Sequence, residues 1–351
     1  MNATRKAVVG VDTAKSVFQV YTVEQETGEV INKPIKRAQF LQWFANRVPC
    51  LVGMEACGGS QHWARKLQEL GHEVKLMSGK MVKGFVCGNK NDAADARAIY
   101  MAAKQPEVRS VAVKTEGQQA VLAMHRIRQQ LVKVRTAQIN ELRGLLGEYG
   151  EVFGLGRKAF DTGIQGALGR LAERLPGPLI DTLRDQWNEL ARLDDRIARI
   201  EASLLAWMRQ ERGARAISAI PGVGLLTATA AVAAIGDAKT FRSGLEFAAW
   251  IGLVPGQTGS GGKVRLLGMS KRGDTYLRTL LIHGARAVLR HAKTPSLWLQ
   301  QLSQRRPPNV VIVALANKIA RTIWAVLAHD RAYDKDHVST RPYAAATWKA
   351  I

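Results

Sequence analysis

The N-terminal segment Val8-Val9-Gly10-Val11-Asp12-Thr13-Ala14-Lys15 is an apolar run that ends in a carboxylate where the chain turns. Its β-branched residues predict a buried strand with Asp12 at the carboxyl end. A second run, Cys50-Leu51-Val52-Gly53-Met54, ends in the same way at Glu55. Parallel neighbours in one sheet have their carboxyl ends at the same edge, so we expect Asp12 and Glu55 to meet there.

The segments around these runs complete an α/β pattern. Val17–Val23 and Glu29–Ile35 predict two antiparallel strands that follow the first one. A helix over Gln61–Leu70 and a strand over Glu73–Met77 follow the second buried run. Periodicity alone supports a mixed α/β domain over residues 1–110. Three antiparallel strands followed by alternating helix and parallel strand is also the order of an RNase H-like domain.

Two more carboxylates, Asp92 and Asp95, stand three residues apart at a predicted helix start, so they share one face. Taken singly, such residues are often turns or caps, with Asp92 as the N-cap and Asp95 at N3. Four converging carboxylates would repel strongly, and bound Mg²⁺ is the usual compensation. The set Asp12, Glu55, Asp92 and Asp95 therefore predicts a site for Mg²⁺, with two ions suited to phosphoryl transfer.

The overall charge indicates the partner. The chain has 51 Lys and Arg against 29 Asp and Glu, a net charge of +22 and a pI near 10.3. A field of this size attracts polyanions, so nucleic acid is the expected partner. A basic surface kept for solubility, or for an acidic protein partner, is the alternative.

Other features of the composition bear on the compartment. The three cysteines, Cys50, Cys57 and Cys87, form no CxxC pair, which is typical of thiols in a reducing compartment. The N-terminus lacks the apolar core of a signal peptide, and no stretch of about 18 uncharged apolar residues exists for a membrane span. We expect a cytoplasmic, nucleoid-associated protein without a membrane partner.

From about Glu116 the pattern changes to long helices, which define a helical region over residues 111–212. Apolar residues repeat in the a/d pattern of a coiled coil at Leu183, Leu190, Leu193, Ile197, Ile200, Leu204 and Trp207. The seam predicts either a dimerisation arm or an internal helical hairpin, because a heptad pattern does not reveal whose helix fills it. The Gly-rich stretch Gly144–Gly169 predicts a loop or short helices.

The third region, residues 213–335, begins with Ile217–Gly224, where a helix ends in a Gly-Val-Gly turn. This pattern predicts a helix-hairpin-helix, in which backbone N–H groups near Gly222 and Gly224 hold a phosphate. A tight turn between packed helices is the alternative. A Gly/Ser loop follows at Gly256–Gly262, then a basic stretch and apolar helices, and residues 336–351 form a tail.

The sequence resembles the DEDD transposases of the IS-one-ten class of bacterial insertion sequences, which have a RuvC-like N-terminal domain and are described as guided by a bridge RNA. Five motifs in the family's order carry the resemblance over almost the whole chain. They are GVDTAK (10–15), GMEACGGS (53–60), NDAADAR (91–97), IPGVG (220–224) and FAAWIGLVPGQTGSGGKVRLLGMSKRGDTYLR (247–278).

The resemblance carries the acidic tetrad onto the four carboxylates already singled out, and the family's C-terminal serine nucleophile onto Ser260. Without it, Ser260 would be an ordinary loop serine. Gly259 stands where the closest subgroup often has another serine. Nearby cations are expected to neutralise phosphates beside the cut, with a solvated basic loop as the alternative. They are Lys263, Arg265, Lys271, Arg272 and Arg278.

The implied function is DNA strand cleavage and exchange, in which Ser260 forms a phosphoserine intermediate while the Mg²⁺-bound tetrad assists. Because Ser260 and Asp12 lie far apart in the sequence, we expect a composite site and a dimer or tetramer. A guide RNA would select the DNA by base pairing. The alternatives are a RuvC-like junction nuclease that uses water, and a non-enzymatic nucleic-acid-binding protein.

Overall fold

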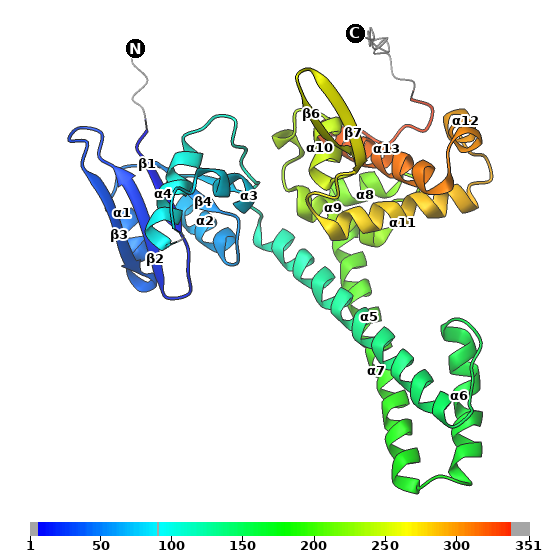
Figure 1. Ribbon diagram of the computed structural model, residues 1–351. Coiled ribbons are helices and arrows are strands. Elements are labelled where there is room, and N and C mark those ends of the chain that lie inside the picture. Colours follow the sequence, from blue (N-terminus) through cyan, green and yellow to red (C-terminus); the bar gives the residue numbers. More distant parts are fainter. Residues whose placement is uncertain (1–5, 90, 338–351) are drawn as a thin grey trace. The chain divides into compact units, whose positions relative to one another are not determined.

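A computed structural model describes residues 6–89 and 91–337 of the chain (Figure 1). The predicted tail, residues 336–351, lies outside the described residues except for its first two positions. The chain forms two compact units. The first comprises residues up to Glu116 together with Ile235–Thr240, and the second comprises Gly117–Ala234 and the residues from Phe241 on.

The first unit is a five-stranded sheet with helices on both faces. Its elements are β1 (Val8–Asp12), β2 (Val17–Val23), β3 (Val30–Lys36), η1 (Arg37–Gln39), α1 (Phe40–Ala45), β4 (Leu51–Glu55), α2 (Ser60–Glu69), β5 (Glu73–Met77), α3 (Gly79–Val82), η2 (Lys83–Phe85), α4 (Asp92–Ala103) and η3 (Ala238–Thr240). The strand order is β3-β2-β1-β4-β5. The first three strands are antiparallel, and β1, β4 and β5 are parallel, which confirms the predicted order.

The two faces of this sheet are covered differently, because successive side chains of a strand point to opposite sides. One face carries the apolar core, in which Val9 and Val11 pack with Phe18, Phe40 and Trp63 beneath α1 and α2. The aromatic rings meet edge to face, with the centroids of Phe18 and Phe40 4.7 Å apart. This core holds the strands rigidly in register.

The other face carries α4, which approaches the sheet at two paired glycines, Gly10 of β1 and Gly53 of β4. A Cβ on Gly10 would lie 2.4 Å from the carbonyl oxygen of Ala96, and one on Gly53 would lie 2.6 Å from the Cβ of Ala103. Any larger residue would push α4 away. The two glycines therefore set how closely α4 approaches the sheet.

The second unit is mainly helical. Its elements are α5 (Glu116–Glu148), α6 (Arg157–Ala172), α7 (Gly177–Gln210), α8 (Arg212–Ser218), α9 (Leu225–Ile235), α10 (Gly244–Ile251), β6 (Pro255–Ser260), β7 (Lys263–Met269), α11 (Thr275–His291), α12 (Leu297–Arg305) and α13 (Pro308–Ala328). Of the two alternatives predicted for Gly144–Gly169, a loop or short helices, the structure has mainly helix, at the end of α5 and in α6. Three glycines lie inside α6, where buried Phe160, Ile164 and Leu168 give the helix an apolar face.

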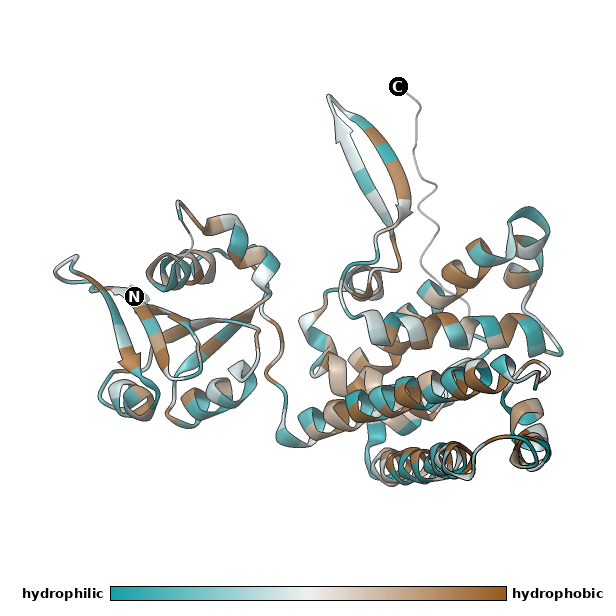
Figure 2. Ribbon diagram, turned by 60° about the horizontal axis from the view of Figure 1, so that its bottom comes forward, coloured by the Kyte–Doolittle hydropathy of each residue, from teal (hydrophilic) through white to brown (hydrophobic). Residues whose placement is uncertain are grey.

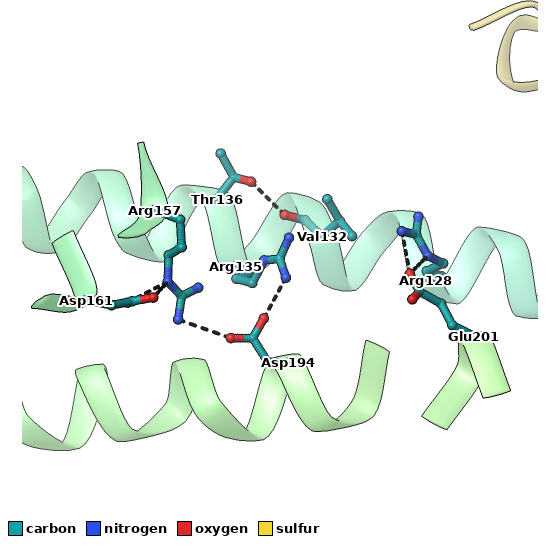
Figure 3. Close-up of polar contacts among 8 residues, drawn as sticks. All are labelled: Arg128, Val132, Arg135, Thr136, Arg157, Asp161, Asp194 and Glu201. Atoms are coloured by element: carbon teal, nitrogen blue, oxygen red, sulfur yellow. Dashed lines mark hydrogen bonds and ion pairs between the residues drawn. The ribbon is translucent and has the colours of Figure 1, made fainter. Parts of the chain in front are cut away.

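The heptad seam of α7 is filled by the chain's own helices. Leu183, Leu190 and Ile197 are buried in one cluster with side chains of α5 and α6. Ion pairs cross between the helices at Arg128–Glu201 and Arg135–Asp194, and the order of these partners makes α5 and α7 antiparallel (Figure 3). The seam is therefore buried within the chain, as the internal helical hairpin predicts.

The C-terminal helices pack around α13. Among the described residues, α13 is the one helix whose length and apolar composition would allow it to cross a membrane, a test that a core helix also passes. It buries an apolar stripe of Val311, Ile312, Leu315, Ala316, Ile319, Ala320, Ile323 and Val326. Its Lys318 ammonium lies 4.6 Å from the centroid of the Trp298 ring on α12. In this fold α13 is the helix around which α8, α10, α11 and α12 pack.

Candidate acidic site and serine hairpin

Four carboxylates gather at one edge of the sheet. Asp12 and Glu55 end β1 and β4, which are parallel neighbours, with Val11 paired to Met54 one residue earlier. Both side chains follow Gly10 and Gly53 by two residues, so they lie on the face that α4 covers. The first turn of α4 contributes Asp92 and Asp95.

The cap of α4 is Asn91. Its side-chain oxygen accepts a hydrogen bond from the backbone N–H of Ala94 at 2.8 Å. The alternative that Asp92 is the N-cap is therefore wrong, and its carboxylate stands one position inside the helix, on the turn that also carries Asp95. An N-cap asparagine meets the helix's need for an acceptor without using either aspartate.

The electrostatics of Asp12 show that the four groups share one environment. Burial is the largest cause that raises the pKa of Asp12 from 3.8 to about 6, followed by the negative charges of Asp95, Asp92 and Glu55. The backbone N–H of Thr13 opposes this rise. Negative charge concentrated at one point disfavours each further ionisation, which is the condition that a bound cation relieves.

The donor set suits a divalent cation in chemistry, because carboxylate oxygens are the ligands that Mg²⁺ and similar hard ions take. Within residues 6–89 and 91–337, no three His, Cys, Asp or Glu side chains stand close enough together to hold an ion as they are arranged. The four carboxylates of the acidic cluster are therefore near one another, but they are not arranged at the spacing of metal ligands.

Further residues, not anticipated from the sequence, support the acidic cluster. Glu55 packs against Gly79 at the start of α3, where a Cβ would lie 2.5 Å from Glu55 Oε1. On the other side, Gln19 Nε2 donates to Asn32 Oδ1 at 2.7 Å, and Asn32 Nδ2 donates to the carbonyl of Ala93 at 3.3 Å. This chain of amides ties β2 and β3 to the acidic turn of α4.

Ser260 lies at the tip of a β-hairpin, where a Gly/Ser loop was expected. The turn is Gly261-Gly262, with φ of +55° and +78°, and Ser260 pairs directly with Lys263 across it. Two glycines at positive φ form the tight turn that joins strands with the natural twist. The alternation of charged and apolar residues from Lys263 to Leu266 was the overlooked signal for a strand.

The two faces of this hairpin differ in chemistry. Ser260, Lys263 and Arg265 lie on one face, since directly paired residues and residues two apart share a side. Val264 and Leu266 lie on the opposite face and remain 52% and 62% exposed. The alternation along β7 is visible in Figure 2. Ser260 is thus exposed on the same face of the hairpin as two cations.

The cations after the hairpin divide into two kinds. Lys271 and Arg272 are exposed, like Lys263 and Arg265. Arg278 is buried, and its guanidinium donates to the carbonyls of Ile251 and Arg272, both at 2.8 Å, and to Thr275 Oγ1. The expectation that Arg278 neutralises a phosphate is corrected here, because its donors hold the end of α10 and the turn before α11.

The Gly-Val-Gly turn lies between α8 and α9. Gly222 has φ +86° and packs on α11, where a Cβ would lie 2.9 Å from the carbonyl oxygen of Gly284. This close approach gives Gly222 a packing role that explains the residue without a ligand. Gly224 is exposed directly before α9, so phosphate binding there stays a prediction.

Comparison with known proteins shows which family the chain belongs to. A family model described as transposase of the IS116/IS110/IS902 family matches residues 214–298, and a second transposase model, of the DEDD type, matches residues 9–151. A probable family 20 transposase of Pseudomonas aeruginosa is 48% identical over 338 residues, which cover 95% of this chain and 99% of the relative. The chain belongs to this transposase family.

Two other relatives of this transposase are named for insertion sequences. The transposase of element IS1111A from Coxiella burnetii is 44% identical, over 93% of this chain and 91% of the relative. The transposase of element IS1328 from Yersinia enterocolitica is 36% identical, over 93% of this chain and 98% of the relative.

Family membership fixes the broad activity of the transposase. Such proteins act on DNA, which they cleave and transfer, and the DEDD type indicates dependence on a divalent metal and an RNase H-like first domain. One matched region contains all four carboxylates and the other contains Ser260. The acidic cluster and the serine hairpin thus lie in the two parts of the chain that define the family.

Proposed function

We propose that this insertion-sequence transposase cuts and rejoins DNA with Ser260 as nucleophile, assisted by two Mg²⁺ ions held by Asp12, Glu55, Asp92 and Asp95. The observation that carries the proposal is the gathering of four carboxylates at one edge of the sheet, from the ends of two parallel strands and from the first turn of α4. The raised pKa of Asp12 agrees with this arrangement. A protein gains nothing for its stability from such a cluster, so a cation-dependent role is the simplest reason for it.

Ser260 would open the reaction. Its Oγ attacks the phosphorus of a DNA phosphodiester, so that an O–P bond forms and the bond from phosphorus to the 3′ oxygen breaks. The hydroxyl proton leaves Ser260, and the departing 3′ oxygen gains a proton. Lys263 and Arg265, on the serine's face of the hairpin, neutralise the flanking phosphates. Bound Mg²⁺ would stabilise the charge on the attacking and leaving oxygens. Attack by a 3′ hydroxyl on the phosphoserine reverses these bonds and joins new ends.

The composite site implies assembly. Ser260 and Asp12 belong to different compact units, so catalysis needs a serine unit and an acidic unit to come together, within one chain or between copies. We propose a dimer or tetramer in which the serine unit of one copy acts with the acidic unit of another. The heptad seam does not supply the interface, because Leu190 and Ile197 are already buried within the chain.

A guide RNA fits the same proposal. The net charge of +22 suits a protein that holds several nucleic-acid backbones while base pairing selects the target. On α5, Arg126 and Lys133 are exposed and available to an RNA backbone, whereas Arg128 and Arg135 form ion pairs with α7. The transposase would act in the cytoplasm, at the nucleoid.

The test is an adduct assay. Purified transposase, RNA transcribed from the ends of its element, and a labelled DNA junction are incubated with Mg²⁺ and resolved on denaturing gels. We expect a protein–DNA adduct that disappears in Ser260→Ala and in Asp12→Asn. Wild-type cleavage by Ser260→Ala without any adduct would overturn the serine mechanism in favour of a water-using nuclease.

A further inference from the structure

A basic groove in the first unit is not used by the acidic site. It has a volume of about 800 Å³ and opens at the edge of the sheet where β1 ends, β2 begins and β3 ends. Its lining residues are Lys15, Ser16, Val17, Lys36, Arg37, Ala38, Leu41 and Trp63. The size lies within the range of sites that bind small molecules or single groups of larger ligands.

The floor of the groove is apolar and aromatic. Trp63 belongs to the core, and the guanidinium of Arg37 lies 4.9 Å from the centroid of its ring. Arg37 is itself exposed, so its planar guanidinium lies over the ring and is accessible to solvent. Val17, which is 43% exposed, and Leu41 complete the apolar part. A flat aromatic ligand can stack on such a plane.

The rim of the groove is positive. Lys15, Lys36 and Arg37 line it, and no carboxylate is among its eight lining residues. Exposed cations around an apolar floor, in a chain of net charge +22, favour a ligand that combines a flat base with flanking negative charges. A membrane surface or an apolar peptide would not contact both the cations of the rim and the flat floor of the groove.

The groove is attached to the acidic cluster by a short, fixed loop. Arg37 Nη1 donates to the carbonyl of Lys15 at 3.3 Å, and the Arg37 backbone N–H donates to the carbonyl of Ser16 at 2.9 Å. Lys15 follows Asp12 by three residues, so their Cα atoms are at most about 11 Å apart. A DNA strand that reached both sites would pass around this edge of the sheet. Asp12 faces α4, whereas Trp63 lies under the opposite face.

We propose that this groove holds an unpaired base of the DNA strand that is cut at the acidic cluster. The inference rests on the proposed function, because it takes the strand at the cluster to be the cleaved one. The base stacks on the exposed face of Arg37, and the phosphates on either side contact Lys15 and Lys36. The groove thereby holds the strand at the same edge of the sheet as the scissile phosphate.

Photocrosslinking in EDTA tests the groove apart from the chemistry. The full-length transposase is irradiated with a single-stranded DNA oligonucleotide carrying 5-iodouracil, and crosslinked peptides are identified by mass spectrometry. We expect crosslinks in the peptides that contain Arg37 and Trp63. Arg37→Ala should reduce them about five- to a hundredfold, the range for one stacked base.

Two further variants keep the test decisive. Ala38→Trp fills the groove without removing a charge, and it should abolish the groove crosslink. Lys36→Glu should weaken the crosslink several-fold, whereas Lys33→Glu makes the same charge change on an exposed residue of the same strand outside the groove and should not. Circular dichroism confirms that each variant is folded.

The outcomes separate the two proposals. Groove crosslinks that persist in Ala38→Trp, or that appear with RNA but not with DNA of the same sequence, would overturn the inference. Normal groove crosslinks in a transposase whose Ser260→Ala variant still cleaves would leave the groove in place and overturn the serine mechanism. Absence of any groove crosslink beside a normal Ser260 adduct would overturn the groove alone.

Discussion

Removing the negative charge of Asp12 should make the metal-free transposase more stable at neutral pH while it abolishes cleavage. Burial and the carboxylates of Asp95, Asp92 and Glu55 raise the pKa of Asp12 from 3.8 to about 6. An acid whose pKa is raised by folding destabilises the native state wherever it is ionised. That cost appears as the pH rises through 3.8 and is complete above about 6.

The size of the effect follows from the shift. A rise from 3.8 to about 6 corresponds to about 3 kcal/mol, and solvent screening of the half-buried side chain reduces this to about 1–2 kcal/mol. In Asp12→Asn this cost is absent. For a unit of about a hundred residues the expected rise in melting temperature at pH 8 is about 5–10 °C.

Differential scanning calorimetry in EDTA measures the difference between Asp12→Asn and the wild type at pH 8 and at pH 4. We expect the stabilisation at pH 8 to shrink toward zero at pH 4, where Asp12 is largely protonated in the wild type. Mg²⁺ should raise the melting temperature of the wild type at pH 8 more than that of the variant. Asp185→Asn, an exposed aspartate of α7, is the matched control. Equal or lower stability of Asp12→Asn at pH 8 would show that the charge of Asp12 does not destabilise the metal-free fold.

Three other changes have defined outcomes. Gly10→Val should push α4 away from the sheet, because a Cβ there would lie 2.4 Å from the Ala96 carbonyl oxygen. The free energy of unfolding should fall by about 3 kcal/mol or more, and cleavage should be abolished. Gly84→Ala, which meets no atom within 4 Å, is the control in calorimetry. Leu190→Ala should lower the free energy of unfolding by about 2–5 kcal/mol, because the residue is buried within the chain. The size of the oligomer in sedimentation should not change. A smaller oligomer formed by a chain of normal stability would instead place the seam between copies. Burial lowers the pKa of His125 from 6.5 to about 4, so the native state loses stability as the pH falls from 6.5 toward 4. His125→Gln should remove this acid-induced loss. A variant with the wild-type profile in denaturant titrations between pH 7 and pH 4 would contradict this.

The strand ends were predictable because their signal is local. Apolar runs that end in Asp12 and Glu55 indicate both the strands and the place of the carboxylates, and the parallel pairing brought them together as expected. The position of α4 was not predictable in the same way. It depends on Gly10 and Gly53, which are adjacent only after the sheet has formed and are ordinary small residues in the sequence.

The second unit shows the same division. The heptad pattern of α7 predicted a buried seam, but the residues that fill it come from α5 and α6, and periodicity in one helix carries no information about its partner. The Gly/Ser loop around Ser260 became a hairpin because two glycines at positive φ close a tight turn between alternating residues. Arg278 was expected at a phosphate because the sequence shows the charge of a residue but not whether it is buried.

The most direct test of the central claim is to identify the amino acid that carries DNA. The protein–DNA adduct formed with Mg²⁺ and guide RNA is digested with nuclease and trypsin, and the modified peptide is sequenced by mass spectrometry. We expect a phosphodiester-linked nucleotide on Ser260, at the tip of the β6–β7 hairpin. A nucleotide attached to any other side chain, or cleaved DNA from which no modified peptide can be recovered, would contradict it.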